Sequence, residues 1–511
     1  MPASTIIDAP RSAASTSNDR IPLAQKIAFA AGMNTEYVAT GLMTGILWMP
    51  FFNIGLGMSP VVLGGILMFL RFWEAVIDPF MGNLSDNTRT RIGRRRPYLF
   101  VGAAITALLY PLFWYMPSSL SDIGKIVYLS IAGVAFFTAF TVWSIPYYGM
   151  QLELTPNYDE RTRLTGWMTF FSKLSYLAGG WLLSSVMLIG MVVSGKTPEH
   201  ASGWLEQQAL TLLQPLIVLF PVGSQSEKPI VVGMQILCPF IALGILLFGL
   251  LPALFVQERY YATEASFQKK ESFWQSIQES IQCRPLWSLN AAAFFLLMGT
   301  SSVATLGQYV NFYYASQGDL ALGTWIAGWK GTLVVLVGVS TIPLFIWLGE
   351  RFDKRTIVLY MLTCCMLGHL TNYFLMTPEH PYWQILSGTF ESCSLSAVWI
   401  FLPSMKADVA DWDELHTSRR REGAINAFHY WFIKMSLTLS MGLGGLLLAW
   451  SGFDSRHSVQ PEIVTHRMFH IYLILPLLFW GVALLATWRY PITRSQATET
   501  RQQLEARRGK L

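Results

Sequence analysis

Long apolar stretches alternate with short polar segments along the chain. By length, about twelve of these stretches can cross a bilayer core of about 30 Å as helices that rise about 1.5 Å per residue. They cover approximately residues 27–52, 59–83, 97–116, 125–150, 164–194, 230–254, 286–314, 323–348, 356–377, 383–404, 425–450 and 468–488. The pattern predicts an all-α membrane protein with twelve transmembrane helices.

Composition agrees with this prediction. Hydrophobic residues make up 52% of the 511 residues and charged residues only 13%. The mean hydropathy of +0.39 is far from that of a soluble globular chain. The five cysteines lie mostly within the predicted spans and lack the spacing of a metal site. We therefore expect neither a disulfide framework nor a bound metal.

The basic residues indicate the orientation. Most of the 36 Lys and Arg residues fall in the two terminal tails and in the loops after every second span. The loops on the other side hold only Lys125, Lys196, Lys228, Arg456 and Arg467. The positive-inside rule then places both termini in the cytoplasm, which requires an even number of spans. The formal net charge of +5 thus reflects membrane topology, and no nucleic-acid partner is expected.

Two short patterns occur twice in the chain. A motif that ends in Asp86 follows the second span, and a similar motif that ends in Asp353 follows the eighth. Lys173 in the fifth span and Lys434 in the eleventh lie in similar Phe-x-Lys-x-Ser strings. Because both pairs are separated by nearly the same distance, close to half the chain, we predict two homologous six-helix halves.

The predicted organisation has five parts. They are a disordered cytoplasmic tail at 1–26, an N-terminal half at 27–254, a cytoplasmic linker at 255–285, a C-terminal half at 286–490 and a cytoplasmic tail at 491–511. The N-terminal half includes an unusually long extracytoplasmic insertion at 195–229. This insertion is either a helix on the membrane surface or a segment without a role in function.

Three charged residues interrupt the second span. Arg71, Glu74 and Asp78 have the spacing i, i+3 and i+7, so they share one face of a helix. A charge near the bilayer centre costs about 2.5–3.5 kcal/mol. A polar cavity or an ion path would explain these charges, and a self-neutralising structural salt bridge is the alternative. We favour the ion path, because ionisable residues inside a membrane usually serve transport.

The same span carries a distinctive motif. Trp73-Glu-Ala-Val-Ile-Asp78-Pro-Phe-Met-Gly82 is followed by a basic loop that ends in Gly93-Arg-Arg-Arg-Pro97. These residues resemble the glycoside–pentoside–hexuronide:cation symporters, a branch of the major facilitator superfamily, and the likeness covers nearly the whole chain. The resemblance implies two pseudo-symmetric six-helix halves and secondary active transport of a sugar, glycoside or hexuronide.

The resemblance also implies a cation-binding site. Its residues would be Glu74, Asp78, Thr141 and Ser144. Na⁺ prefers hard oxygen ligands, and a protonated carboxyl can replace the ion in a proton-coupled relative. Because Ser144 stands where a family member carries Asp, both Na⁺ and H⁺ stay open as the coupling ion. No other cofactor is implied.

A substrate site is implied next to the cation site. Its residues would be Glu36, Thr169, Lys173, Trp399, Tyr430 and Lys434. The carboxylate of Glu36 would accept sugar hydroxyls, and the ring of Trp399 would stack on a pyranose. Thr169 stands where a family member has Arg, and Lys173, one turn along, would supply the missing positive charge. The alternatives are ordinary packing for Trp399 and snorkelling toward the interface for Lys173.

A third group of residues would form a charge network at the cytoplasmic ends of the helices. Its members are Arg71, Asp86, Arg94, Arg95, Asp353, Asp408 and Asp411. We expect Asp86 to accept hydrogen bonds from loop arginines and to cap the helix that begins near Pro97. Such a network can hold one transport state and break on switching. In the alternative view the arginines only set the topology. His369, His429 and His470 are expected to be packed and hydrogen-bonded, outside the site.

Two other classes of function remain open. One is a lipid mover, other-solute mover or sensor on a transporter fold. The other is a polytopic membrane enzyme, for which the acidic segment 407–414 would be the only candidate catalytic cluster. We expect a transporter and not an enzyme. We further expect a monomer in a bacterial inner membrane, surrounded by lipid, with a small-molecule sugar as its substrate.

Overall fold

The computed structural model describes residues 20–117, 119–154, 158–195, 204–213, 215, 228–258, 281–417 and 422–508. The predicted N-terminal tail lies mostly outside these residues, as do most of the predicted insertion at 195–229 and most of the predicted linker at 255–285. Within the described residues the secondary structure is helical and contains no strand. The all-α prediction is therefore confirmed.

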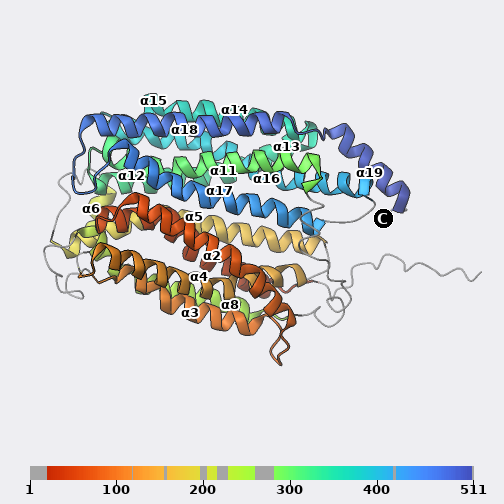
Figure 1. Cartoon of the computed structure of the whole chain (residues 1–511), viewed down its shortest axis with the longest axis horizontal. Coiled ribbons are helices and arrows are strands. Elements are labelled where there is room, and N and C mark those ends of the chain that lie inside the picture. Colours follow the sequence, from red (N-terminus) through yellow and green to blue (C-terminus); the bar gives the residue numbers. More distant parts are fainter. Residues whose placement is uncertain are drawn as a thin grey trace, which may run out of the picture.

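The helices form two bundles that lie side by side (Figure 1). The N-terminal bundle consists of α1 (Leu23–Glu36), η2 (Tyr37–Leu47), η3 (Pro50–Gly55), α2 (Pro60–Asn87), α3 (Arg96–Trp114), α4 (Asp122–Glu153), α5 (Tyr158–Val193) and α8 (Pro229–Phe255), with the short α6 (Trp204–Leu213) beside it. The C-terminal bundle consists of α11 (Arg284–Val310), η4 (Asn311–Ala315), α12 (Leu320–Ser340), α13 (Ile342–Arg351), α14 (Lys354–Leu370), α15 (Asn372–Leu375), η5 (Pro381–Trp383), α16 (Gln384–Thr417), α17 (Glu422–Ser451), α18 (Glu462–Trp488) and α19 (Arg494–Arg508).

Ten helical stretches of the described residues are long and apolar enough to cross a membrane. The two predicted spans outside this set, 27–52 and 383–404, are helical as well. The first runs through the π-helical segments η2 and η3, and the second is the first part of α16. The predicted single spans at 323–348 and 356–377 are each divided. α12 ends before α13 at Thr341, and α14 ends before α15 at Thr371.

Local sequence signals explain where several helices begin. Proline occupies the first turn of α2, α3, α8 and α11, where its missing N–H has no intrahelical partner to lose. Asp319 caps α12 by accepting from the N–H of Leu322, and Asp353 caps α14 by accepting from that of Arg355. Within α2, Pro79 removes one backbone donor directly after Asp78, which leaves a helical carbonyl without its usual partner.

One end of the bundles carries basic segments. The Arg94–Arg96 segment, the C-terminal end of α2, α13 and α19 lie together there, and we call it the basic end (Figure 1). Asp86 on α2 and Asp353 before α14 therefore lie at the same end, as the repeat predicts. We call the opposite end the far end. It holds Pro60, Asn53 and the start of α12.

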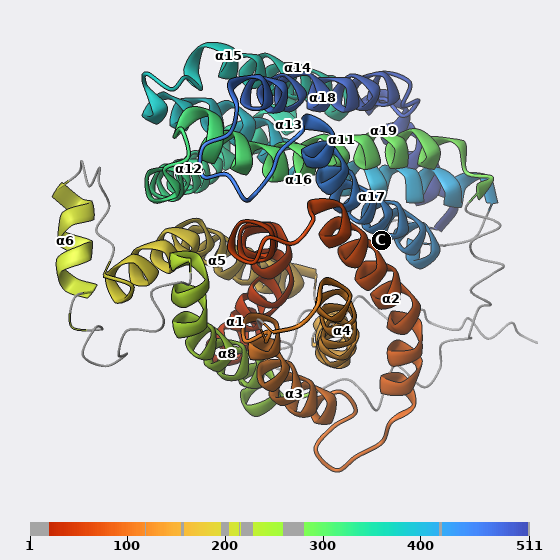
Figure 2. The same cartoon turned by 60° about the vertical axis from the view of Figure 1, so that its left-hand side comes forward.

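The two bundles meet along two helix pairs, α2 with α17 and α5 with α12 (Figure 2). Small residues permit the close approach. A Cβ atom on Gly445 would lie 2.1 Å from the carbonyl oxygen of Pro60, and one on Gly64 would lie 2.9 Å from that of Met441. The hydroxyl of Tyr309 also donates to Asn53 at 2.8 Å. These contacts gather toward the far end, so the bundles are closed there.

We expect Gly445→Trp to open the far end. The indole cannot fit against the Pro60 carbonyl, and a penalty of about 3 kcal/mol against the closed state would shift the equilibrium about 100-fold. Distances between spin labels at Asp122 and Ser455, which line a hollow of about 530 Å³ at this end, should then lengthen. Gly481→Trp is the control, because a Cβ there meets nothing within 4 Å. Unchanged distances in Gly445→Trp would contradict the assignment of this interface as the closed gate.

Candidate functional site

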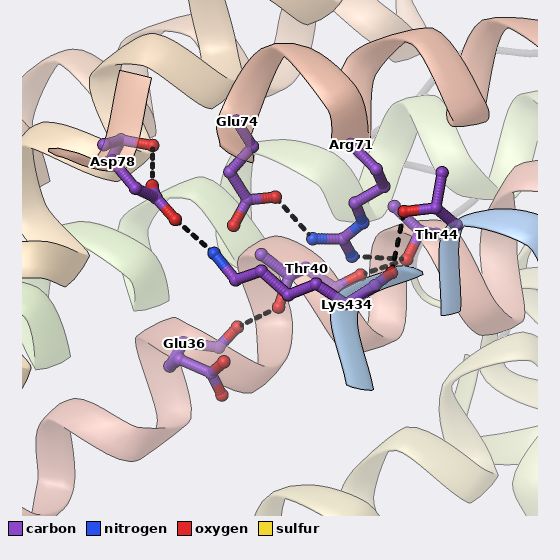
Figure 3. A network of polar contacts seen from close by, with 9 residues as sticks. Glu36, Thr40, Thr44, Arg71, Glu74, Asp78 and Lys434 are labelled. Carbon is purple, nitrogen blue, oxygen red and sulfur yellow. Dashed lines mark hydrogen bonds and ion pairs between the residues drawn. The ribbon is translucent and has the colours of Figure 1, made fainter. Parts of the chain in front are cut away.

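The three charged residues of α2 face the junction between the bundles (Figure 3). The guanidinium of Arg71 pairs with the carboxylate of Glu74 at 2.7 Å, as their i, i+3 spacing predicts. Arg71 also donates to the hydroxyl of Thr44 at 3.3 Å and lies 5.2 Å from the centre of the Phe137 ring. Arg71 therefore belongs to this mid-membrane cluster and not to a network at the helix ends.

Asp78 joins the two bundles. Its carboxylate accepts from the hydroxyl of Thr141 on α4 at 3.3 Å. Its second oxygen pairs with the ammonium of Lys434, which reaches across from α17 (Figure 3). The side chain of Asp78 is 15% exposed and that of Lys434 is 45% exposed, so the pair borders open space. The resemblance implied adjoining cation and substrate sites, and this pair joins Asp78 of the first to Lys434 of the second.

Glu36 approaches the same cluster from the first helix. Its carboxylate hydrogen-bonds the hydroxyl of Tyr148 and lies within electrostatic reach of Arg71 and Glu74. Directly after Glu36 the chain becomes π-helical through Leu47, and the hydroxyl of Thr40 donates to the carbonyl of Glu36 at 2.9 Å. π-helical segments are frequent at functional sites, because they add a residue and re-aim side chains.

The charges of this cluster do not balance. Three carboxylates, those of Glu36, Glu74 and Asp78, stand with two cations, Arg71 and Lys434. A buried carboxylate without a cationic partner is strongly penalised. The cluster is therefore suited to accept one more positive charge, as a metal cation or as a proton.

The other predicted site residues are not members of this cluster. Ser144 is buried one turn after Thr141 on α4. Thr169 is exposed and donates to the carbonyl of Thr165 on its own helix. Lys173 is half-buried on α5 and forms no ion pair within the described part of the chain. The side chain of Trp399 lies outside the described residues, so its role stays a prediction.

Tyr430 lies one turn before Lys434 on α17. Its side chain is 52% exposed, and the ammonium of Lys406 lies 4.9 Å from the centre of its ring. The ring therefore remains available for stacking beside the charged cluster.

An acid that the sequence did not single out lies at the start of α3. The carboxylate of Glu258, which follows α8, accepts from the backbone N–H groups of Arg94, Arg95 and Arg96 at 2.9, 2.8 and 3.0 Å. The side chain of Asp86, predicted to cap this helix, lies outside the described residues, so that role stays a prediction. Arg94 and Arg95 are both buried at this helix start.

The remaining network residues lie at the basic end of the C-terminal bundle. Asp408 on α16 pairs with Lys354 at 2.7 Å, and Asp353 caps α14. Asp411 follows Asp408 by one turn on α16, and its charge acts on that of Asp408. The contacts of Asp408 tie α14 to α16 within one bundle, and they do not reach the charges of α2.

A second ion-pair cluster lies at the basic end of the N-terminal bundle. Glu160 is buried and pairs with Lys26 at 2.6 Å and Arg163 at 2.9 Å. It also accepts from the backbone N–H of Ile21 at 3.3 Å. Burial raises the pKa of Glu160, but the hydrogen bonds from Lys26, Ile21 and Arg163 outweigh it and hold that pKa below its usual value.

We expect Glu160→Gln to lower the thermal unfolding midpoint at pH 7, because it leaves Lys26 buried without its partner at a cost of about 3–5 kcal/mol. A lowered carboxyl pKa stabilises the folded state above the unfolded pKa of about 4.3, and this stabilisation is lost as the pH falls through the folded value. The midpoint difference from the native protein should therefore be constant between about pH 7 and pH 5 and shrink below about pH 4.3. Glu379→Gln, at an exposed loop position, is the control. Equal midpoints for Glu160→Gln and the native protein at pH 7 would refute this account.

Besides the pair of Lys26 and Glu160, sequence reasoning missed a buried pair in the C-terminal bundle. His369 on α14 contacts Glu391 on α16 at 3.0 Å inside the C-terminal bundle. His369 is packed and hydrogen-bonded, as expected, but its partner was not recognised. The available signal was the isolated acid Glu391 within the apolar stretch 383–404.

The arrangement of the helices agrees with a comparison of this chain with known protein families. Residues 28–494 match the family model described as MFS/sugar transport protein. The chain belongs to this family of the major facilitator superfamily. It is therefore a multi-pass membrane transport protein, with two pseudo-symmetric six-helix halves as the resemblance implied.

Named relatives cover almost the full length of the chain. The sodium-dependent lysophosphatidylcholine symporter 1 of Xenopus tropicalis is 23% identical over 95% of this chain and 90% of its own. The isoprimeverose transporter of Lactiplantibacillus pentosus is 22% identical over 91% of this chain and 87% of its own. The solved structure of a D-xylose-proton symporter has the same fold, with a TM-score of 0.55 at 14% identity, and covers 92% of this chain and 97% of that one.

Proposed function

We propose that this transporter couples the entry of a sugar or glycoside to a cation, Na⁺ or H⁺, by alternating access. One observation carries the proposal. Asp78, a carboxylate beside two further acids, is held by a lysine from the opposite bundle. A cation that binds at Asp78 must compete with Lys434, so binding is linked to the contact between the bundles.

The basic end is the cytoplasmic side in this proposal, because the basic loops gather there. The closed far end then makes this the inward-facing state. The extra cation would bind with Asp78, Glu74 and Thr141 as oxygen ligands, and Ser144 would complete the site after a small rearrangement. In the outward-facing state, the segments at the basic end would hold that end closed.

The substrate would lie beside this cluster. The carboxylate of Glu36 accepts sugar hydroxyls, and the exposed ring of Tyr430 stacks on the apolar face of a pyranose. Thr169, Lys173 and Trp399 stay predicted substrate contacts. The relatives support two substrate classes. The family description and the isoprimeverose transporter favour a sugar, and the lysophosphatidylcholine symporter favours a lysophospholipid.

A panel of labelled substrates in proteoliposomes tests the substrate class. We expect accumulation of at least one sugar from a set of galactosides, xylosides, glucuronides and glucose, and only when a Na⁺ or pH gradient is imposed. Lysophosphatidylcholine with a short labelled chain is the competing substrate. Accumulation of the lysolipid alone would overturn the sugar proposal. Accumulation without any gradient would overturn coupling.

A further inference from the structure

The buried pair His369–Glu391 lies apart from the cluster of α2 and α17. His369 is 0% exposed on α14, and the side chain of Glu391 on α16 is 12% exposed. Both lie within the C-terminal bundle, toward the far end. The charged cluster around Asp78 uses neither residue.

The hydrogen bonds of His369 favour one proton between His369 and Glu391. Its Nε2 atom lies 3.0 Å from the backbone carbonyl of Tyr472, which can only accept, so Nε2 carries a hydrogen. Its Nδ1 atom lies 3.0 Å from Oε1 of Glu391. A lone pair on Nδ1 would face a carboxylate lone pair if no hydrogen lay between them. This contact favours one shared proton, on His369 or on Glu391, and the amide of Asn372, 3.5 Å from Nδ1, is the other donor within reach.

The residues around the pair are partly polar, and some of their polar atoms have no hydrogen-bond partner among the described residues. The amide of Asn372 donates to the carbonyl of His369 at 3.0 Å and lies 3.5 Å from Glu391. Within the described residues, Oδ1 of Asn372 and the hydroxyl of Tyr472 have no hydrogen-bond partner, although both are buried. On α14 itself the thiol of Cys365 lies one turn before His369, and the neutral ring of Trp480 on α18 packs 5.2 Å from the imidazole.

One cation faces the pair from a third helix. The side chain of Lys330 on α12 packs against Gly388, which lies one turn before Glu391. A Cβ atom on Gly388 would lie 2.9 Å from the Cε atom of Lys330. Its charge acts on Glu391. With the shared proton the pair is neutral, and without it the pair carries one negative charge that Lys330 balances. Both charge states are therefore possible inside the bundle.

The helix that carries Lys330 also contacts the opposite bundle. On the other side of α12 from Lys330, Gly328 and Thr332 contact Trp181 of α5. The indole N–H donates to the hydroxyl of Thr332 at 2.8 Å, and a Cβ on Gly328 would lie 2.7 Å from the ring. A shift of α12 as a whole toward a negative Glu391 would therefore act on the interface that holds the far end closed.

We propose that His369 and Glu391 form a second proton-binding site, and that release of this proton shifts the interface between α12 and α5 and makes transport depend on pH. The ligand is a proton, and the site is separate from the cation site at Asp78. The proton leaves through the partly exposed carboxyl of Glu391. Lys330 compensates the charge that remains.

Infrared difference spectra of the full chain in nanodiscs, recorded between about pH 5 and pH 9, test the site without any transported substrate. Glu391→Gln retains a donor to Nδ1 but cannot titrate, so we expect the pH-dependent carboxyl and imidazole bands of the pair to disappear. Lys330→Gln removes the balancing charge, so we expect the midpoint to rise by about one pH unit or more. Spectra identical to those of the native protein in both variants would overturn the site.

The link to transport has its own readout. The rate of substrate exchange in proteoliposomes, measured against pH, should lose one titration step in Glu391→Gln. The maximal rate should stay within about twofold of that of the native protein. Lys330→Gln should move the same step upward, which also decides the question if Glu391→Gln does not fold. An unchanged profile in a variant that has lost the infrared bands would overturn the link to the interface. Failure of every exchange assay, with the bands still titrating, would point to the wrong substrate and leave the proton site supported.

Discussion

Asp78→Asn should abolish uphill accumulation of substrate while passive exchange persists. The amide keeps the shape of the side chain and a hydrogen-bond acceptor for Thr141, but it removes the charge that would hold a cation. A loss of about 3 kcal/mol in cation binding corresponds to about 100-fold weaker affinity. Accumulation ratios in proteoliposomes under an imposed cation gradient should therefore fall to about one.

Two controls make this result specific. Asp122→Asn changes an acid whose side chain is 98% exposed at the start of α4, so it should accumulate substrate like the native protein. Thr141→Val removes a neutral ligand and should weaken cation dependence by a smaller factor, about tenfold. Retained accumulation in Asp78→Asn would exclude this residue from the coupling site.

Lys434→Met should block net transport and spare exchange. In the empty carrier the ammonium neutralises Asp78, and without it the return step must carry an uncompensated buried charge. A cost of about 3 kcal/mol slows that step about 100-fold. Because the cation no longer competes with Lys434, cation binding should tighten. Exchange, which never uses the empty carrier, should continue.

Two further variants distinguish the loss of the charge at Lys434 from a general effect of removing a lysine. Lys434→Arg keeps the positive charge and should restore a large part of net uptake. Lys125→Met removes a lysine that pairs with the exposed Asp122 at 3.6 Å, and it should have no effect. Equal losses of net uptake and exchange in Lys434→Met would instead indicate a lysine needed for folding.

The helices and part of the site could be predicted from the sequence. Hydropathy and loop charges located the spans, and the spacing of Arg71, Glu74 and Asp78 was enough to place these residues on one face of a helix. The division of the span at 323–348 had a signal that the hydropathy pattern passes over, because Pro343 follows the break at Thr341 and lies in the first turn of α13. The π-helical stretch after Glu36 is likewise invisible to a hydropathy pattern.

Contacts between segments that are distant in the sequence were the main limit on predicting the site. Lys434 and Asp78 lie in different bundles, and only the resemblance and the repeat suggested that they meet. Glu258 lies at the edge of a polar linker with many charges, so nothing in its local sequence marks it as the cap of α3. Glu391 was overlooked for a different reason. It is a single acid in an apolar span, and the rule applied to α2 would have singled it out.

Coupling is the central claim, and paired flux measurement tests it most directly. Labelled substrate and labelled cation, or substrate and internal pH, are followed in the same proteoliposomes while the membrane potential is clamped. A fixed ratio of cation to substrate, lost in Asp78→Asn and retained in Asp122→Asn, is the result we predict. Substrate movement that follows only its own gradient, with no accompanying Na⁺ or H⁺ flux, would contradict it.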